Sequence, residues 1–350
     1  MKTSFVSTLA SQNAMRLTIQ RSQVEIQNLQ KEVVTGRYAD LGEALGASAS
    51  RSITLNRDVF RLETIRDSNS LVTQRLTSTQ LALTEMSTQA QDLLEAFISV
   101  NSSDDANRLA IANQSITTAL SAFTSAANTS SNGEYLMGGI NTDTQPLADY
   151  QAAGSSAKTA FDNAFVTYFG FTQTDPAASG ITVAQMDDFI SNTLEPMFDG
   201  PNWNSDWSAA SDINVSSRIS RTEVVESNTN ANTEGVRAFA LASVIGLELL
   251  SAPISDEVRS AVNSRAIQYA GEAVNKVDAV RSKLGISENR VTKANDALEA
   301  QMKIYKLHAA DLEGVDAYEA STRMKSLLAQ VETSYQLTAR ISQLNLTNFL

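Results

Sequence analysis

Two long heptad stripes constrain the fold of this chain more than any other feature of its sequence. Alternate steps of three and four residues give a first stripe of Leu55, Asp58, Leu62, Ile65, Asn69, Val72, Leu76, Thr79, Leu83, Met86, Ala90, Leu93, Phe97 and Val100. From Ala266 they give a second stripe of Ala270, Ala273, Val277, Val280, Leu284, Ser287, Val291, Ala294, Leu298, Gln301, Tyr305, His308 and Leu312. Such sustained repeats are typical of coiled-coil helices. We expect two long helices. The first residues of the second stripe are small, so a partner helix could approach most closely there.

Proline is confined to the middle of the chain, at positions 146, 176, 196, 201 and 253. Because proline ends or kinks helices, both flanks are open to long helices while the middle is interrupted. Both tryptophans and six of the twelve phenylalanines also fall in the middle. This shift in composition predicts an inserted domain at about residues 141–220.

A polar run, Asn101–Asp105, is expected to end the first long helix and to cap the next one. The apolar positions of that next helix are Leu109, Ile116, Leu120, Phe123 and Ala127. Gly271 and Gly285 lie inside the second stripe, where each costs about 1 kcal/mol relative to alanine. The repeat is long enough for us to expect a helix there nevertheless.

The order of stripe, insertion and stripe indicates an antiparallel pair of long helices that carries the inserted domain. Two narrower stripes lie outside this pair. The amino-terminal one is Met15, Ile19, Ser22, Ile26, Leu29 and Val33, and the carboxy-terminal one is Met324, Leu327, Leu328, Val331, Tyr335, Ile341 and Leu344. We predict a mainly α fold, an antiparallel long-helix rod (a coiled-coil bundle), in which the inserted smaller domain is α+β or β-rich.

The two terminal stripes offer little apolar surface for their length. About ten large apolar side chains in each offset only part of the backbone entropy lost when some forty residues become ordered. We therefore expect both terminal helices to be labile in the monomer and to become ordered against other copies or partners.

Charge excludes several classes of function. The net charge is −12, which argues against a general nucleic-acid-binding protein. Residues 140–215 alone hold ten carboxylates and a single base, Lys158, a net charge of −9 that favours a solvated surface. No segment has the roughly 18 continuous apolar residues of a membrane helix, and the start, MKTSFVSTLASQNAMR, lacks the apolar region of a Sec signal peptide. We expect neither nucleic acid nor membrane as a partner.

Residues for catalysis are scarce. The chain has no cysteine and one histidine, His308, which we interpret as a seam or surface residue. The common nucleophilic triads and histidine-rich metal sites are therefore not expected. Asp187 and Asp188 could hold calcium or act as a glycosidase pair, but solvated acidic surface is the simpler interpretation. We expect no enzyme activity, no metal and no cofactor.

Two glycine patterns and two tryptophans are also interpreted as structural features and not as binding sites. Gly138-Gly139 and Gly42-x-x-x-Gly46 lack the residues of a phosphate-binding loop, so turns are expected. Trp203 and Trp207 could line a carbohydrate surface, but an anchoring role in a small core is favoured.

Both ends of the chain resemble one family. Gln12-Asn13-Ala14, the heptads after Met15, and VVTGRYADLG (residues 33–42) are similar to the amino-terminal region of flagellin-type proteins. Thr35-Gly36-Arg37 matches the "TG-basic" turn that closes the family's first helix. DLEGVDAYEASTRMKSLLAQVETSYQLTARISQLNL (residues 311–346) resembles the family's carboxy-terminal helix, entered through an acidic turn.

Within this superfamily the chain looks more like the hook–filament junction proteins (hook-associated protein 3) than filament flagellin. NGEYLMGGINTDTQPL, Asn132 to Leu147, is similar to their glycine-rich turn with a "YLF-G" core, although Met137 stands where Phe is common. The early SxxDD turn of filament flagellins is not evident, because Asp40-Leu41-Gly42-Glu43 occupies that region. The opening MKTSFVSTLASQNAMR also fits the junction proteins better.

The resemblance implies a flagellin-like fold and a structural role in the bacterial flagellum, where the protein would join hook to filament and be required for motility. Such proteins are exported unfolded through the flagellar type III apparatus and assemble as a ring between the hook-side junction protein and flagellin, with an export chaperone as a further partner. The implied divisions are an N-terminal polymerisation arm (1–42), two rod halves (43–140 and 221–314), an outer variable domain (141–220) and a C-terminal polymerisation arm (315–350).

The resemblance also implies an assembly interface on the terminal helices. The residues that we expect in it are Met15, Ile19, Ile26, Leu29, Val33, Leu328, Val331, Tyr335, Ile341 and Leu344.

Three other functions stay open at this point. Filament flagellin is the near alternative. A signalling coiled-coil rod is a remote one, against which the acidic, aromatic insertion argues. An enzyme with its site in residues 141–220 is more remote still.

Overall fold

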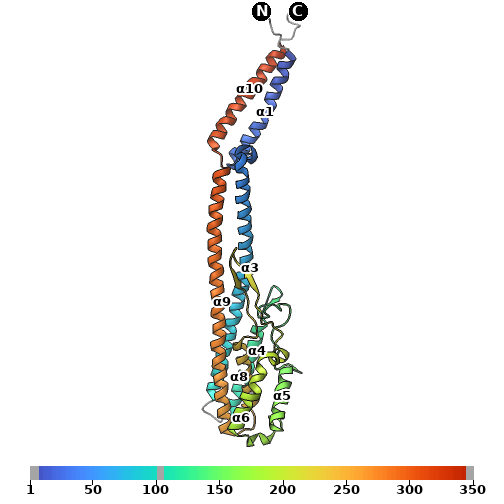
Figure 1. Cartoon of the computed structure of the whole chain (residues 1–350), viewed down its shortest axis with the longest axis vertical. Coiled ribbons are helices and arrows are strands. Elements are labelled where there is room, and N and C mark those ends of the chain that lie inside the picture. Colours follow the sequence, from blue (N-terminus) through green and yellow to red (C-terminus); the bar gives the residue numbers. More distant parts are fainter. Residues whose placement is uncertain (1–7, 101–105, 344–350) are drawn as a thin grey trace, which may run out of the picture. The chain divides into compact units, whose positions relative to one another are not determined.

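The computed structural model describes residues 8–100 and 106–343, and these are mainly helical (Figure 1). The helices are α1 (Thr8–Thr35), α2 (Leu41–Leu45), α3 (Ala49–Val100), α4 (Ala106–Ala127), α5 (Ser156–Phe169), α6 (Val183–Phe189), α7 (Gly200–Asp206), α8 (Glu234–Val244), α9 (Asp256–Glu313) and α10 (Ala317–Gln343). The short strands are β1 (Ser130–Ser131), β2 (Glu134–Tyr135), β3 (Ser216–Arg218) and β4 (Val224–Glu226). β1 pairs with β2 and β3 with β4, both antiparallel.

The chain divides into two compact units. One comprises residues 1–64 with 297–350, and the other residues 65–296. The long helices α3 and α9, of 52 and 58 residues, contribute to both. Both helices lack proline, as the sequence predicts, and Gly271 and Gly285 lie within α9.

The central unit, residues 65–296, is built on antiparallel segments of α3 and α9. Gln80 Nε2 donates to the carbonyl oxygen of Arg281 at 2.8 Å, and Ser87 Oγ to Asp278 Oδ1 at 2.9 Å. Every position of the first stripe from Asn69 to Val100 is buried. The predicted antiparallel pair is therefore confirmed. Its polar positions are bonded as well, since Asn69 Nδ2 donates to Asn295 Oδ1 at 2.8 Å.

Small residues on α9 permit a close approach, as expected. Ala266, Ala270 and Ala273 are fully buried. A Cβ added to Gly235, in the first turn of α8, would lie 2.7 Å from the backbone nitrogen of Val277. The backbones of α8 and α9 are thus packed too closely for a side chain between them.

The second stripe departs from its predicted positions after Leu298. Gln301 and His308 are exposed, whereas Met302 and Ala309 are buried. Two consecutive steps of four residues, as in a stutter, move the apolar edge by one position. The expectation that Gln301 and His308 continue the buried stripe is therefore wrong, and His308 is a surface histidine.

Within the central unit, the middle of the chain forms mainly short helices. Trp203 and Trp207 are buried and stacked, with ring centroids 5.5 Å apart, and Tyr150 stacks on Trp207 at 5.3 Å. Both tryptophans are therefore core anchors, as favoured. Sheet is limited here to the hairpin β3–β4, so of the two expected insertions the α+β form is observed and the β-rich one is not.

The glycine-rich turn after α4 ties distant segments together. Gly139 has a φ of 62°, and a Cβ there would lie against the carbonyl oxygens of Ser211 and Ile213. The backbone nitrogen of Ala231 donates to the carbonyl oxygen of Met137 at 2.8 Å. Met137 is fully buried, so it fills the place where the family commonly has Phe. Gly138-Gly139 is confirmed as a turn.

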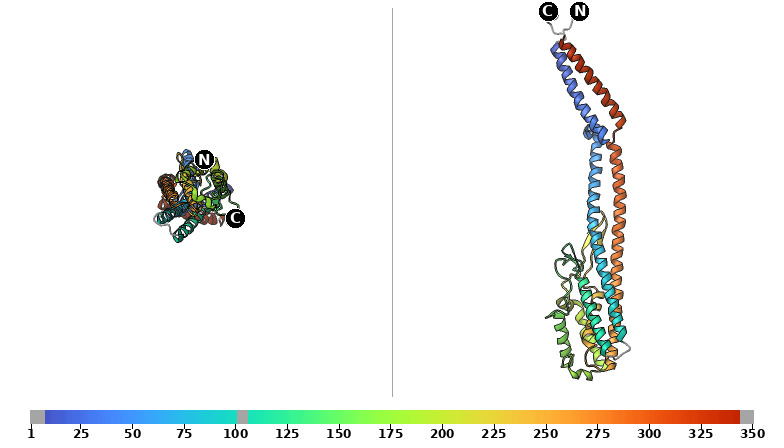
Figure 2. Two further views of the ribbon diagram at one scale, coloured as in Figure 1. Left: turned by 90° about the horizontal axis from the view of Figure 1, so that it is seen from below. Right: turned by 180° about the vertical axis from the view of Figure 1, so that it is seen from behind.

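The terminal unit contains α1, α2, α10 and the adjoining ends of α3 and α9. α1 packs against α10, and Figures 1 and 2 show the two helices side by side. Gly46 follows α2 with a φ of 50°, but Gly42 lies within α2, so the turn predicted for Gly42-x-x-x-Gly46 is a short helix that ends at Gly46. Residues 101–105, where the sequence predicts a break and a cap, lie outside the described residues, although α3 ends at Val100 and α4 begins at Ala106.

Candidate assembly surface

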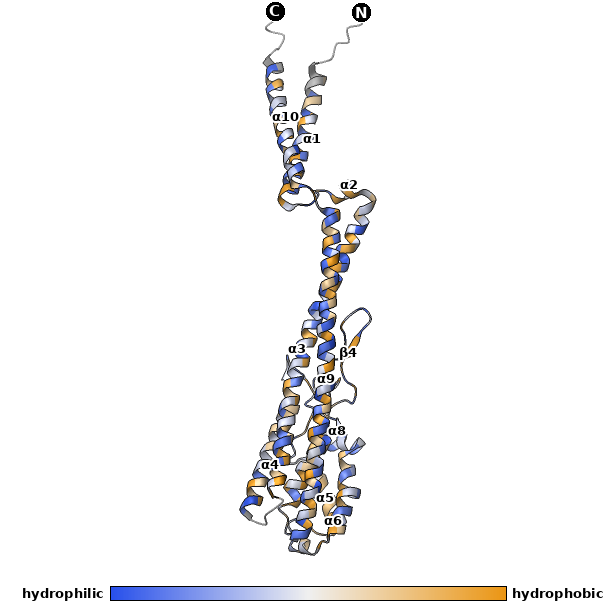
Figure 3. Ribbon diagram, turned by 90° about the vertical axis from the view of Figure 1, so that its left-hand side faces the viewer, coloured by the Kyte–Doolittle hydropathy of each residue, from blue (hydrophilic) through white to orange (hydrophobic). Residues whose placement is uncertain are grey.

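Polar side-chain contacts link the antiparallel helices α1 and α10. Gln23 Nε2 donates to the Tyr335 hydroxyl at 2.9 Å, and Arg323 forms an ion pair with Glu25 at 2.8 Å. The Thr338 hydroxyl contacts the sulfur of Met15 at 3.6 Å. Figure 3 shows apolar and polar residues interleaved along the visible faces of both helices.

The predicted interface residues of α1 lie on or beside the seam with α10. Ile19 and Leu29 are buried, with 8% and 6% of their surface exposed, and Met15, Ile26 and Val33 are half-buried. Within the monomer, much of this stripe is therefore covered already. Its contact with neighbouring subunits stays a prediction.

The predicted residues of α10 are less covered. Val331 is half-buried, while Leu328 and Tyr335 are 48% and 52% exposed. Ile341 belongs to α10, but its side chain is outside what the structure describes, as is the whole of Leu344. Leu328 and Tyr335 are thus available to a partner without any rearrangement.

Sequence reasoning missed five exposed apolar residues of the pair. These are Leu17, Val24 and Val34 on α1 and Tyr318 and Leu337 on α10, exposed by 56%, 58%, 80%, 83% and 46%. None of them belongs to the amino-terminal or the carboxy-terminal stripe. The seven-residue spacing of Leu17 and Val24, which places both on one helix face, is the signal that could have found them.

A groove of about 830 Å³ lies where the second half of α1 and the first turns of α10 meet residues 38–44. Val24, Leu29, Tyr38 and Val315 supply apolar lining. Its charged lining is mostly acidic and consists of Arg21, Glu25, Glu32, Asp40, Glu43, Asp316, Glu319 and Arg323. The groove thus combines apolar contact area with negative charge, but it offers no nucleophile beside a base among the described residues.

The "TG-basic" turn has a definite structural role here. The Thr35 hydroxyl caps the end of α1 by donating to the carbonyl oxygen of Lys31 at 2.8 Å. Gly36 has a φ of 67°, and Arg37 forms an ion pair with Glu313 at 3.0 Å. The turn therefore links the end of α1 to the end of α9.

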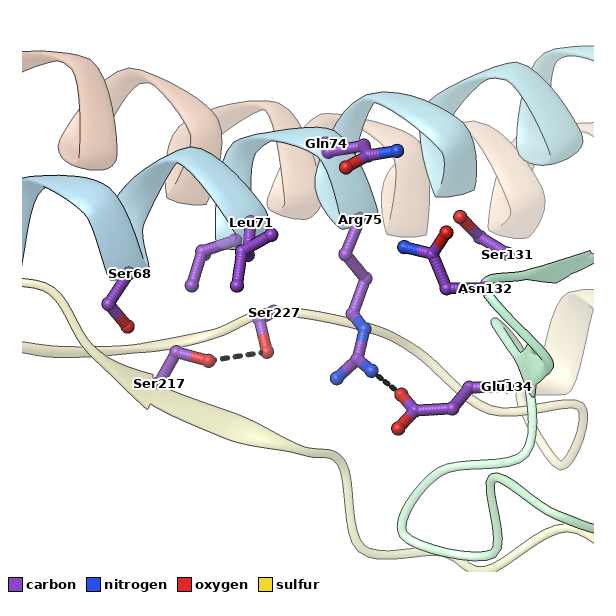
Figure 4. A pocket seen from close by; sticks show the side chains of 10 residues that line it. Ser68, Leu71, Gln74, Arg75, Ser131, Asn132, Glu134, Ser217 and Ser227 are labelled. Carbon is purple, nitrogen blue, oxygen red and sulfur yellow. Dashed lines mark hydrogen bonds and ion pairs between the residues drawn. The ribbon is translucent and has the colours of Figure 1, made fainter.

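A smaller pocket of about 300 Å³ lies in the central unit (Figure 4). Its lining consists of Ser68, Leu71, Val72, Gln74, Arg75, Ser131, Asn132, Glu134, Ser217 and Ser227. Arg75 is ion-paired with Glu134, and the Ser217 hydroxyl donates to that of Ser227 at 2.9 Å. These polar groups satisfy one another, and no lining residue is a base positioned to activate a serine.

A polar cluster ties the insertion to the turn of π-helix at residues 245–249. Glu248 accepts hydrogen bonds from the Tyr150 hydroxyl and from Lys158 Nζ, each at 2.9 Å, and from Gln173 Nε2 at 3.2 Å. Burial raises the pKa of Tyr150, and Glu248 adds to this effect. Burial lowers the pKa of Lys158, but its bonds with Glu248 and Asp162 outweigh that effect and raise it overall. Tyrosine and lysine thus keep their protons at neutral pH, which suits a structural tie.

Asp187 and Asp188 do not converge on a common site. Asp187 pairs with Arg265 at 3.2 Å. Asp188 accepts hydrogen bonds from the Tyr168 hydroxyl and from Asn192, which lower the pKa of its carboxyl group. In the described part of the chain, no group of three or more His, Asp or Glu side chains could hold a metal ion. None of the described helices is long and apolar enough to cross a membrane.

Comparison with known families shows which of these surfaces belongs to a characterised region. The bacterial flagellin N-terminal helical region matches residues 6–142, and the bacterial flagellin C-terminal helical region matches residues 267–350. Together the matches span more than half of the chain. The chain belongs to the flagellin family. It is thus a structural, non-enzymatic protein and an extracellular component of the flagellum.

The fold of this flagellin-family chain is similar to that of a candidate flagellar hook-associated protein from Vibrio parahaemolyticus. The two share 10% sequence identity with a TM-score of 0.52, over 76% of this chain and 97% of the other. At this identity the likeness shows the fold alone. No curated protein sequence matches the chain at a significant level.

Family membership directs attention to the α1–α10 pair, because flagellins polymerise with other flagellar components. Leu17, Val24, Leu328 and Tyr335 are large, exposed and carried by the matched N- and C-terminal regions. The pair is therefore the candidate assembly surface of this flagellin-family protein.

Proposed function

We propose that this protein joins the hook to the filament of the bacterial flagellum, and that it polymerises through α1 and α10. The observation that carries the proposal is the exposure of large apolar residues on both helices, among them Val24, Tyr318 and Leu337. Two paired helices without a third layer leave such residues in water, so neighbouring subunits are the natural cover.

Three features support the junction rather than the filament. Asn132–Leu147 resembles the glycine-rich turn of junction proteins, and here it forms a closely packed turn at Gly139. Asp40–Glu43 stands where filament flagellins have their SxxDD turn. The solved fold to which the chain is similar carries a hook-associated description.

The proposed partners follow from this position. Copies of the chain would form a ring between the hook-side junction protein and flagellin, with the terminal helices packed as inner layers and the proposed 141–220 domain facing outward. Before export, a flagellar chaperone would cover α10, whose Leu328 and Tyr335 are exposed. The absence of cysteine suits a chain that must unfold, cross the export apparatus and refold.

A deletion strain tests the junction proposal. Loss of a junction protein leaves hooks without filaments while flagellin monomers are secreted into the medium. Loss of filament flagellin, the alternative function, leaves capped hooks and no secreted flagellin. The second phenotype would replace the proposal by the alternative.

A truncation tests the assembly surface separately. Removing residues 330–350 deletes Val331, Tyr335 and Leu337 but leaves the central unit intact. We expect a soluble protein that is secreted but not incorporated into flagella. Motile cells carrying the truncated protein would show that the end of α10 is not needed for assembly.

A further inference from the structure

One carboxylate in the terminal unit is buried almost completely. The side chain of Glu313, the last residue of α9, is 1% exposed. Its Oε2 atom pairs with Arg37 at 3.0 Å. Its Oε1 atom accepts hydrogen bonds from Asn56 Nδ2 at 2.7 Å and from the Ser52 hydroxyl. A single carboxylate thus joins the turn after α1, the first turns of α3 and the end of α9.

Apolar packing does little to fix the neighbouring segment. Neither α2 nor the 3₁₀ turn at residues 46–48 contains a buried residue. Gly36 and Gly46 both have positive φ, and a Cβ added to either would meet no atom within 4 Å. Between α1 and α3 the chain therefore lacks a core of its own.

Backbone bonds at the same place bring the roots of both terminal helices together. The nitrogen of Tyr38 donates to the carbonyl oxygen of Glu313 at 3.0 Å, and the nitrogen of Val315 donates to that of Gly36 at 3.0 Å. These two bonds stand directly beside the Glu313 carboxylate. Their geometry depends on the residue that is held by Arg37, Ser52 and Asn56.

We propose that Glu313 is a clamp that fixes where α1 and α10 leave the ends of α3 and α9. The clamp keeps the end of α1 beside the start of α10, so that both helices are presented together. Burial makes the carboxylate depend on all of its partners, because an uncompensated buried charge is strongly destabilising. The clamp is a property of the folded chain and does not depend on whether the protein lies at the junction or in the filament.

Amide hydrogen exchange on the purified full-length protein tests the clamp in the variants Glu313→Ala and Arg37→Ala. For Glu313→Ala we expect the amides of Tyr38, Val315 and residues 52–56 to exchange roughly a hundredfold faster or more, the effect of breaking a buried ionic contact. Arg37→Ala leaves the buried carboxylate of Glu313 without its cation, so an acceleration of similar size is expected at the same amides.

Lys306→Ala is the matched control. Lys306 also forms an ion pair across the ends of α3 and α9, with Glu63 at 2.7 Å, but its side chain is 60% exposed. We expect it to leave all of these exchange rates unchanged. Unchanged rates at Tyr38 and Val315 in Glu313→Ala would overturn the proposal, as would acceleration spread evenly over residues 297–313. If Glu313→Ala fails to fold, unchanged rates in Arg37→Ala overturn the proposal alone.

Discussion

The central unit and the terminal helix pair bury apolar surface to very different extents. In residues 65–296, α3, α4, α8 and α9 enclose a core in which Phe97, Phe123 and Phe239 are at most 1% exposed. Along α1 and α10, the buried side chains among those described are Ile19, Ser22, Leu29 and Ala320. A pair of helices has one seam, whereas several layers surround a volume and exclude water from it. From this difference we expect the middle of the molecule to be stable by itself and the terminal helices to need neighbours.

The largest expected difference is in amide exchange of the free monomer. We expect fast exchange in residues 8–35 and 325–343, because one narrow seam offsets little of the backbone entropy of two helices. Residues 83–97, on the buried side of α3, should exchange orders of magnitude more slowly, since opening them requires global unfolding. Strong protection in both terminal helices of the monomer would contradict the comparison, and polymerised protein serves as the protected control.

Core truncation should separate the two regions next. Phe239 is fully buried, and its ring stacks on that of Phe123 with centroids 3.7 Å apart. Phe239→Ala should lower the free energy of unfolding of the central unit by about 3–5 kcal/mol. Both tryptophans lie in this unit, so their fluorescence in a denaturant titration reports its unfolding.

Leu337→Ala on α10 is the contrasting variant. Leu337 is 46% exposed, so we expect a change of at most about 0.5 kcal/mol in the monomer. The same variant should reduce incorporation into flagella, because the exposed side chain lies on the candidate assembly surface. Similar losses of monomer stability in the two variants would remove the distinction between core and surface.

Two glycines sharpen the comparison inside the central unit. Gly139→Ala combines a positive φ with a Cβ pressed against two carbonyl oxygens, so we expect a loss of about 2–4 kcal/mol in unfolding free energy. Gly133 also has a positive φ, but a Cβ there meets no atom within 4 Å. Gly133→Ala should therefore cost about 1–2 kcal/mol. Equal losses in the two variants would show that close packing of the turn contributes nothing.

Much of the fold follows from the sequence because heptad spacing is a local property. The stripe of α3 from Asn69 to Val100, the helical course of α9 and the burial of Trp203 and Trp207 are all predicted and observed. The shift after Leu298 is not, since a fixed three–four stepping cannot register two consecutive steps of four. A helix edge drifts with the actual twist of the backbone, which periodicity alone does not report.

The candidate site is predicted less completely, for a different reason. The stripes of α1 and α10 identify residues that meet in their own seam, such as Ile19 and Leu29, and these are not the most exposed ones. The partners of Glu313 are separated from it by more than 250 residues along the chain. Only the antiparallel course of α3 and α9 brings them together, so the clamp cannot be predicted from a local motif.

The last expected effect concerns one tyrosine of the central unit. Burial, followed by the nearby carboxylate of Glu195, raises the pKa of Tyr269 to about 12 from an ordinary value of 10.0. Its hydroxyl donates to Glu195 Oε2 at 3.0 Å. Because the folded state holds the phenol proton more tightly, this contribution to stability is fully present below pH 10.0 and is lost as the pH rises to about 12.

Tyr269→Phe removes that titration. We expect a loss of about 1 kcal/mol at neutral pH, the value of one hydrogen bond. Between pH 10 and about 12, the unfolding free energy of the variant should fall less steeply than that of the unaltered protein. Tyr318→Phe, at a tyrosine that is 83% exposed, is the control variant. A slope in Tyr269→Phe equal to that of the unaltered protein would mean that Tyr269 titrates alike in the folded and unfolded chains. The central unit would then be open to solvent at this point on α9, as the terminal helices are along most of their length.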